Sequence, residues 1–336
     1  MKRRILGRTD IEAAAVGFGG IPIQGLTAGE AERVLLHAAD CGIDFFDSAR
    51  GYTDSEEKIG RALAARRDTI FLSSKALSRD SDGMRKEIET SLRNLRTGMI
   101  DLYQCHSVDS IDQLERILGP GGAWEALAVA REEGFVRWIG LTSHSREVTA
   151  AALRTGRFDT IQVPFNAIET EWGQAVLPAA HDARIGTIGM KPLAGGALSS
   201  GEAALRFALA GGIDIAIPGM DAIEQVTENI RAGDLAGPTD EHTALLDGER
   251  EAWGGLFCRR CRYCLPCPEG LNIPFLLLLE GYHSRYGLTE WAVARLSTQE
   301  KRFSACTACG ACLERCPYHL PIPDLMKRAA RLLEHD

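Results

Sequence analysis

Eight of the ten cysteines lie near the end of this 336-residue chain, at spacings short enough for several thiols to act together. They form two runs, which are Cys258, Cys261, Cys264 and Cys267, and then Cys306, Cys309, Cys312 and Cys316. Cys41 and Cys105 lie far upstream, and we expect them to be packing residues. A disulfide scaffold needs an oxidising compartment, which no export signal indicates, so the grouping predicts metal binding.

The second run has the spacing Cys-x2-Cys-x2-Cys-x3-Cys and is followed by Pro317. This spacing lets three thiolates on one tight loop bind three corners of a 4Fe-4S cubane. The first run ends in Cys267 and Pro268 but is one residue shorter before its last cysteine. Zinc is the alternative metal. Structural zinc usually takes paired Cys-x2-Cys units, so triplets followed by Cys-Pro favour iron–sulfur.

The motif also predicts which cysteines share a cluster. In two-cluster proteins the fourth cysteine of each run binds the other cluster, so we expect two 4Fe-4S clusters with crossed ligation. One set is Cys258, Cys261, Cys264 and Cys316, and the other is Cys306, Cys309, Cys312 and Cys267. Residues 256–336 carry more Lys and Arg than Asp and Glu, although the whole chain has a net charge of −8. We interpret this excess as an offset to thiolate charge rather than as a docking face for an acidic partner.

A second set of reactive side chains lies in the first half of the chain, where Asp47, Tyr52, Lys75 and His106 follow successive apolar runs. A nearby ammonium stabilises a phenolate and lowers the pKa of a tyrosine. Lys75 could do this for Tyr52, with Asp47 holding the lysine and His106 orienting a carbonyl oxygen. Each residue taken singly could be a cap, a loop residue or a solvated charge. Together they predict an acid that protonates an alkoxide as hydride arrives.

The elements that must position these residues are short apolar runs that alternate with amphipathic stretches of helical length. The expected strands are Val16–Gly20, Asp44–Asp47, Ile70–Ser74, Leu102–Cys105, Trp138–Leu141, Thr160–Val163, Gly186–Met190 and Ile213–Ile217. The expected helices include Ala28–Asp40, Ser55–Arg66, Gly83–Arg96 and Ala123–Glu133. Eight βα units in about 220 residues predict an α/β fold, the (β/α)8 TIM barrel, with its chemistry at the C-terminal ends of the strands. A Rossmann sheet is the alternative, but Pro22 stands where its fingerprint needs the last glycine.

Three segments around these residues resemble the aldo-keto reductases. They are GIDFFDSARGYTDSE from Gly42, SSK ending at Lys75, and DLYQCH ending at His106. The resemblance covers about residues 3 to 232. It implies a (β/α)8 barrel, a catalytic tetrad of Asp47, Tyr52, Lys75 and His106 with Tyr52 as general acid, and NADP(H) or NAD(H) as cofactor.

The same resemblance implies a nucleotide site on the later strands. Positions that bind the nicotinamide carboxamide match Thr142, Ser143 and Gln162. The loop over the pyrophosphate matches Pro192, Leu193 and Gly195, and the adenosine end matches Gly219, Gln225, Glu228 and Asn229. Met190 stands where the family usually stacks an aromatic ring on nicotinamide. Gly219 and Gln225 replace the Lys and Arg that usually bind the 2′-phosphate, which removes charge-assisted contacts.

The two sets of motifs predict two domains. We expect a barrel over residues 1–240, a linker rich in glycine and acidic residues over 241–255, and a small, mainly α-helical ferredoxin-like domain over 256–336. The last part resembles α-helical ferredoxin domains. Its fusion behind the barrel resembles an iron–sulfur subgroup of aldo-keto reductases, over essentially the whole chain.

Composition excludes intrinsically disordered and fibrous proteins. Hydrophobic residues make up 45% and charged residues 25%, as in soluble globular proteins. The longest apolar run is too short to cross a membrane, and the negative net charge argues against nucleic-acid binding. We therefore expect a cytoplasmic protein.

The predicted function is that of an oxidoreductase which interconverts a small-molecule carbonyl and an alcohol. The clusters would relay electrons to an external carrier such as ferredoxin or flavodoxin. The alternative is an iron–sulfur electron-transfer or sensing protein whose barrel no longer binds nicotinamide. Purely structural clusters are a third possibility.

Overall fold

The computed structural model describes residues 1–334, which fall into two compact units. Unit 1 comprises Met1–Ala194 and Ser200–Thr243, and unit 2 comprises Gly195–Ser199 and the chain from Ala244 onward. The segment expected to be a linker is helical, because α11 (Asp240–Gly254) runs through it. Asp240 and Glu241 in its first turn favour a helix.

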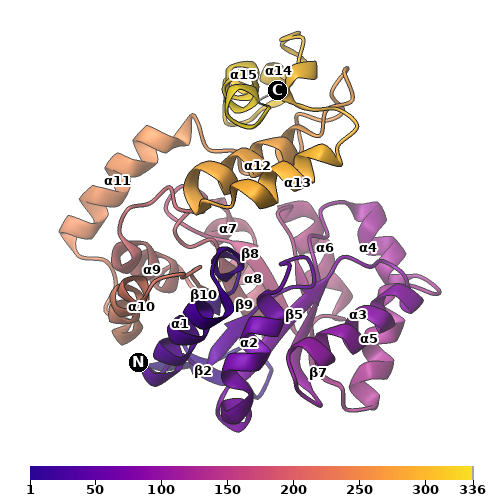
Figure 1. Cartoon of the computed structure of the whole chain (residues 1–336), viewed down its shortest axis with the longest axis vertical. Helices are drawn as coiled ribbons and strands as arrows, with labels where there is room; N and C mark the ends of the chain where they lie inside the picture. The colour runs from indigo at the N-terminus through magenta and orange to yellow at the C-terminus, as the bar shows by residue number, and fades with distance from the viewer. Residues whose placement is uncertain (335–336) are drawn as a thin grey trace. The chain divides into compact units, whose positions relative to one another are not determined.

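Unit 1 contains eight parallel strands wound into a nearly closed barrel with helices around it (Figure 1). The strands are β3 (Phe18–Gly19), β4 (Phe45–Asp47), β5 (Phe71–Ala76), β6 (Ile100–Cys105), β7 (Val136–Thr142), β8 (Thr160–Pro164), β9 (Gly186–Met190) and β10 (Ile215–Ile217). Each pairs with its neighbours in chain order, and bridges from Val16 to Ala216 and from Gly19 to Gly219 join the first strand to the last. The predicted barrel is confirmed, and each expected strand overlaps an observed one.

The helices of unit 1 follow the strands in the expected alternation. They are α1 (Ala28–Asp40), α2 (Ser55–Leu63), α3 (Ser81–Asn94), α4 (Ile111–Leu118), α5 (Ala123–Glu132), α6 (Arg146–Thr155), α7 (Glu171–Ala175), α8 (Leu177–Asp182), α9 (Gly201–Ala210) and α10 (Ile223–Asn229). Short 3-10 turns are η1 (Pro22–Gly25), η2 (Ala64–Thr69) and η3 (Ile230–Asp234). Helix α1 has the predicted bounds, because Thr27 and Glu30 form a capping box that fixes its start.

A hairpin that the sequence analysis did not predict precedes the barrel. Its strands, β1 (Arg3–Ile5) and β2 (Glu12–Ala14), pair antiparallel. Leu6 and Ile11 from the connecting turn are fully buried and pack in one cluster with Phe45 and Leu102 of the barrel strands. The hairpin therefore fills one end of the barrel interior with apolar side chains.

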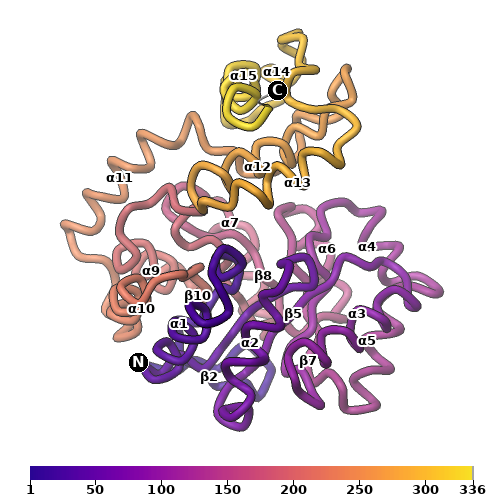
Figure 2. Tube along the Cα trace, viewed as in Figure 1, coloured from indigo at the N-terminus to yellow at the C-terminus, as the bar shows by residue number. Residues whose placement is uncertain are grey.

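Unit 2 is mainly helical (Figure 2). Beyond α11 it contains α12 (Ile273–Tyr286), α13 (Thr289–Ser297), η4 (Phe303–Ala305), α14 (Ala311–Arg315) and α15 (Ile322–Leu333). Its core combines leucine side chains such as Leu276 with the buried thiols of Cys264, Cys312 and Cys316. Among residues 1–334, no helix has the length and apolar character needed to span a bilayer.

The close approach of α2 and α3 gives a test of this packing. A Cβ on Gly60 would lie 2.2 Å from the backbone oxygen of Asn94, so Gly60→Ala must separate two helices. We expect it to lower the free energy of unfolding by about 1–3 kcal/mol, although alanine is the better helix former. The matched control is Gly29→Ala in α1, where a Cβ would meet nothing within 4 Å.

Chemical denaturation of both variants measures the difference. Gly29→Ala should change stability by no more than about 1 kcal/mol, in the stabilising direction. Equal stabilities for the two variants would contradict the packing of α2 against α3.

Candidate active site and candidate iron–sulfur centre

A buried ion pair lies in the barrel, where strands β4 and β5 end. The Lys75 Nζ is 2.5 Å from Asp47 Oδ2 and donates to the Ser48 backbone oxygen at 2.7 Å. The side chains of Lys75 and Asp47 are only 1% and 3% exposed. Burial lowers the pKa of Lys75 and raises that of Asp47, and the attraction between the two charges opposes both shifts.

Two aromatic rings lie beside this pair. The Lys75 Nζ is 5.0 Å from the centre of the Tyr52 ring, and the Tyr52 and His106 rings meet edge to face with their centres 5.8 Å apart. Tyr52 comes from the loop after β4 and His106 from the end of β6. The structure therefore brings together the four residues that the resemblance implies as a tetrad.

Asp47 has further polar partners from neighbouring strands. Ser73 Oγ donates to Asp47 Oδ1 at 2.9 Å, and Gln162 also hydrogen-bonds this carboxylate. The fully buried Gln104 of β6 donates from Nε2 to Gln162 Oε1 at 2.7 Å and to Ser73 Oγ at 3.1 Å. The sequence analysis missed Gln104. A glutamine inside the expected strand Leu102–Cys105 was the signal that could have found it.

The loop that carries Tyr52 is fixed by a buried carboxylate. Glu56, in the first turn of α2, accepts hydrogen bonds from Ser74 Oγ at 2.5 Å and from Ser91 Oγ at 2.7 Å. Its other oxygen is 2.7 Å from Arg50 Nη1. Since Arg50 and Glu56 flank Tyr52 in the chain, these contacts restrain the loop on both sides of the tyrosine.

The residues expected to bind the nicotinamide carboxamide already have protein partners. Thr142 Oγ1 accepts from the Ser107 backbone N–H at 2.8 Å, and Ser143 Oγ donates to the Val108 backbone oxygen at 2.7 Å. Gln162 bonds Gln104 and Asp47 as described above. All three side chains are buried, so the polar atoms that the resemblance assigns to the cofactor take part in the internal network of the barrel.

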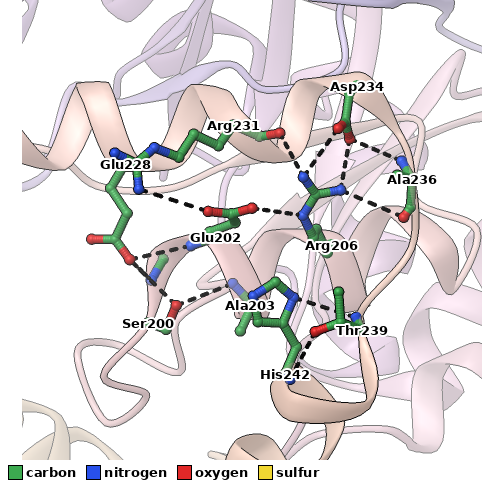
Figure 3. Close-up of polar contacts among 11 residues, drawn as sticks. Ser200, Glu202, Ala203, Arg206, Glu228, Arg231, Asp234, Ala236, Thr239 and His242 are labelled. Carbon is green, nitrogen blue, oxygen red and sulfur yellow. Dashed lines mark hydrogen bonds and ion pairs between the residues drawn. The ribbon is translucent and has the colours of Figure 1, made fainter.

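At the expected adenosine end, Glu228 binds the start of a helix. Its Oε1 accepts from the backbone N–H of Gly201 at 2.7 Å and from Ser200 Oγ at 3.3 Å, as Figure 3 shows for Ser200. A carboxylate thus occupies the positive N-terminal end of α9, where a phosphate would also be favoured. Asn229 is buried behind it, with its side-chain oxygen against Gly201.

The other expected nucleotide residues lie in loops and at strand ends. Met190 ends β9 and is half-buried, and Pro192 and Leu193 follow it in unit 1, whereas Gly195 belongs to unit 2. Gly219 is exposed next to Pro22. The exposed Gln225 accepts from the Asp221 backbone N–H at 2.8 Å. Neither Gly219 nor Gln225 supplies a cation.

In unit 2 the eight clustered cysteines separate into two groups in space. Cys258, Cys261 and Cys316 interact electrostatically with one another, and Cys264 interacts with Cys258 and Cys261 and also with Cys312. A small cavity is lined by Cys267, Cys306, Cys309 and Cys312. Each group therefore contains three cysteines from one run and the last cysteine of the other run.

The chemistry of these groups suits iron–sulfur ligation. Burial raises the pKa of Cys258 to about 11 and of Cys264 to about 12, so these thiols stay protonated until a metal binds them. Backbone N–H groups of Arg260 and Tyr263 bond Cys258 and Cys261. Among residues 1–334, no three or more His, Cys, Asp and Glu side chains are placed to hold a single metal ion. A cubane is larger than one ion and takes each thiolate on a different iron.

Comparison with known proteins decides the family. The model of the Aldo/keto reductase family matches residues 15–203, which is more than half of the chain. The chain belongs to this family. A 4Fe-4S dicluster domain model matches residues 257–321, so unit 2 contains a 4Fe-4S domain rather than a zinc site. Both predicted resemblances are confirmed.

Individual relatives match the barrel part. The aldo-keto reductase YhdN of Bacillus subtilis is 31% identical over 56% of this chain and 61% of its own length. The Schizosaccharomyces pombe aldo-keto reductase yakc [NADP(+)] is 29% identical over 55% of this chain and 59% of its own. The chain thus spans about three fifths of these relatives. A Bacillus halodurans aldo-keto reductase in its holo form superposes with a TM-score of 0.63 and 25% identity, covering 74% of this chain and 96% of that one.

The buried ion pair predicts strong coupling between two substitutions. Lys75→Met leaves an unpaired carboxylate at Asp47, and Asp47→Asn leaves an unpaired ammonium. Each should lower the free energy of unfolding by about 3–5 kcal/mol, and the double variant should lose clearly less than the sum.

Urea denaturation of the four proteins completes this double-mutant cycle. As a control, Arg85→Met removes the exposed ion pairs of Arg85 with Glu89 and Glu133, and it should cost less than about 1 kcal/mol. Strictly additive losses at Asp47 and Lys75 would show that the two charges do not stabilise each other.

Proposed function

We propose that this protein is a nicotinamide-dependent oxidoreductase that interconverts a carbonyl and an alcohol, with Tyr52 as the proton donor and acceptor. The observation that carries the proposal is the position of the Lys75 ammonium. Its Nζ is 2.5 Å from Asp47 Oδ2 and 5.0 Å from the centre of the Tyr52 ring. A cation beside a phenol stabilises the phenolate, which is the form that Tyr52 takes after it gives up its proton.

Each of the four tetrad residues has a separate role in this reaction. Tyr52 donates its proton to the oxygen of a carbonyl substrate and recovers it in the reverse direction. Lys75 stabilises the phenolate, and Asp47 keeps the ammonium in place. His106, packed against the Tyr52 ring, hydrogen-bonds the substrate oxygen and fixes its direction. A nicotinamide, when bound, would supply or accept the hydride.

Tyr52→Phe tests this assignment. The variant keeps the ring between Lys75 and His106 and loses only the hydroxyl, so we expect carbonyl reduction to fall by about 10²–10⁴-fold. Tyr263→Phe is the control, because Tyr263 is exposed in unit 2. Nucleotide affinity and iron content should stay unchanged in both variants. Wild-type turnover in Tyr52→Phe would exclude Tyr52 as the proton donor.

We further propose that the nucleotide lies along the ends of the later strands. Thr142, Ser143, Gln162 and Met190 would line the nicotinamide. Pro192 and Leu193 would line the pyrophosphate, and Gly219, Gln225, Glu228 and Asn229 the adenosine. The name of the yeast relative includes NADP(+). Because Gly219 and Gln225 carry no positive charge here, this chain should discriminate weakly between NADPH and NADH.

Gln225→Arg should therefore create a preference. A guanidinium at this exposed position can bind a 2′-phosphate, so we expect the affinity for NADPH to rise about tenfold while that for NADH stays constant. Fluorescence titration with both nucleotides measures the ratio. Gln225→Met, which has similar length and no charge, should leave the ratio near that of the native protein. An unchanged ratio in Gln225→Arg would remove this residue from the 2′-phosphate site.

In unit 2 we propose two 4Fe-4S clusters with crossed ligation, one on Cys258, Cys261, Cys264 and Cys316 and one on Cys306, Cys309, Cys312 and Cys267. The separation of the cysteines into these two groups supports the assignment. The clusters would exchange electrons with an external one-electron carrier such as ferredoxin or flavodoxin.

One set of contacts favours a second candidate, an iron–sulfur electron-transfer or sensing protein whose barrel does not bind nicotinamide. The side chains of Thr142, Ser143 and Gln162 are engaged with protein partners, and Glu228 occupies the N-terminus of α9. Titration of the purified protein with NADPH and NADH separates the two candidates. Micromolar binding of either nucleotide supports the enzyme, and no binding of both supports the electron-transfer protein.

A further inference from the structure

Four buried side chains on strands β4, β5, β6 and β8 form a closed ring of hydrogen bonds. Ser73 Oγ donates to Asp47 Oδ1 at 2.9 Å, and Gln104 Nε2 donates to Ser73 Oγ at 3.1 Å. Gln104 Nε2 also donates to Gln162 Oε1 at 2.7 Å, and Gln162 hydrogen-bonds the Asp47 carboxylate. None of the four residues is more than 2% exposed, so water does not compete for these bonds.

The charge of Asp47 sets the direction of each bond in the ring. An ionised carboxylate only accepts hydrogen bonds, so Ser73 uses its one proton on Asp47 and its Oγ accepts from Gln104. The second N–H of Gln104 needs another acceptor, which is the Oε1 of Gln162. Gln162 therefore directs its Nε2 toward Asp47, because a reversed amide would place an oxygen against the carboxylate and an N–H against the N–H of Gln104.

Gln104 holds this orientation at a cost. Its Oε1 is buried and has no hydrogen-bond partner among residues 1–334, which destabilises the fold unless the two donated bonds offset the loss. The adjacent strand also makes room for the side chain at Gly140, where a Cβ would lie 2.9 Å from Gln104 Cγ and 3.0 Å from Gln104 Oε1. An unpaired buried oxygen needs an explanation, and the donors of Gln104 provide one.

The ring also decides which group of Gln162 is left for a ligand. A side-chain amide has two N–H donors and one acceptor oxygen. In the described part of the chain, the Oε1 of Gln162 accepts from Gln104 and one N–H is used on Asp47. The second N–H remains. A nicotinamide carboxamide has an oxygen that accepts such a hydrogen bond.

We propose that Gln104 is a positioning residue for the cofactor: it holds the Oε1 of Gln162, so that Gln162 offers an N–H to the carboxamide oxygen of nicotinamide. This inference rests on the proposed function, in which Gln162 lines the nicotinamide. The same ring ends on Asp47, which holds Lys75. One network thus fixes both the side chain expected at the cofactor and the ion pair beside Tyr52.

Gln104→Met tests the proposal, because methionine keeps the length of the side chain and removes both donors. Without them the Gln162 amide can rotate, so we expect the affinity for NADH to fall about tenfold. The affinity for ADP-ribose, which lacks the nicotinamide ring, should stay unchanged. Calorimetric titration of the full-length protein with both ligands measures the two affinities. General damage to the barrel would weaken both ligands alike.

Two further variants accompany this measurement. Ser73→Ala opens the ring between Asp47 and Gln104 without changing either glutamine, and it should weaken NADH by about two- to fivefold and leave ADP-ribose unaffected. It decides the question alone if Gln104→Met does not fold. Gln299→Leu is the control, because Gln299 donates only to the neighbouring Thr298 at the surface of unit 2, at 3.4 Å. It should change neither affinity.

A double-mutant cycle in the nucleotide-free protein tests the contact itself. Gln104→Met and Gln162→Met each leave a buried polar group of the other glutamine unpaired, so the double variant should lower the urea midpoint by clearly less than the sum of the single changes. Additive changes would show that the two amides do not interact, which would overturn the inference.

The ligand measurements separate this inference from the function beneath it. A native protein that binds none of NADH, NADPH and ADP-ribose would overturn the proposed function, and the inference with it. A native protein that binds NADH no more tightly than ADP-ribose keeps its nucleotide site and overturns the inference alone. Equal losses of NADH and ADP-ribose affinity in Gln104→Met, or no loss in either Gln104→Met or Ser73→Ala, would also remove Gln104 from this role.

Discussion

The buried contact between Lys75 and Asp47 is the constraint on which the rest of the barrel site depends. An ammonium and a carboxylate, both nearly inaccessible to water, are stable only when each is paired and its remaining hydrogen bonds are satisfied. The neighbouring strands supply those bonds through Ser48, Ser73 and Gln162. A parallel barrel can do this because the ends of adjacent strands converge at one edge. The pair in turn fixes a positive charge beside Tyr52, the residue that we propose as the proton donor.

The barrel could be predicted because its signal is repeated. Eight apolar runs alternate with helical stretches, and no single misplaced boundary changes that count. The hairpin β1–β2 could not be predicted in this way, because Arg3 and Glu12 lie in it and its burial depends on Leu6 and Ile11 in the turn. The helix over segment 241–255 was not predicted either. Two of its glycines lie within helix α11, where the remaining helix-forming residues outweigh them.

The positions of the tetrad side chains were easier to predict than the hydrogen bonds of the side chains that were expected to line a nucleotide. Asp47 ends β4, Lys75 lies near the end of β5 and His106 follows β6, so their positions depend only on the fold. The availability of Thr142, Ser143 and Gln162 depends on side chains distant in sequence, such as Gln104, and on the backbone at Ser107 and Val108. The contact of Glu228 could not be predicted either, because the α9 N-terminus that it binds is formed by another part of the chain. Hydrogen bonds of this kind have no local sequence signature.

In unit 2 the ligands are also part of the core. Cys264, Cys312 and Cys316 pack among leucines, and burial keeps the thiol of Cys264 protonated in the absence of metal. A metal must displace that proton to bind, so the energy of metal binding is spent partly on folding this unit. The same burial would disfavour the additional negative charge of a reduced 4Fe-4S group.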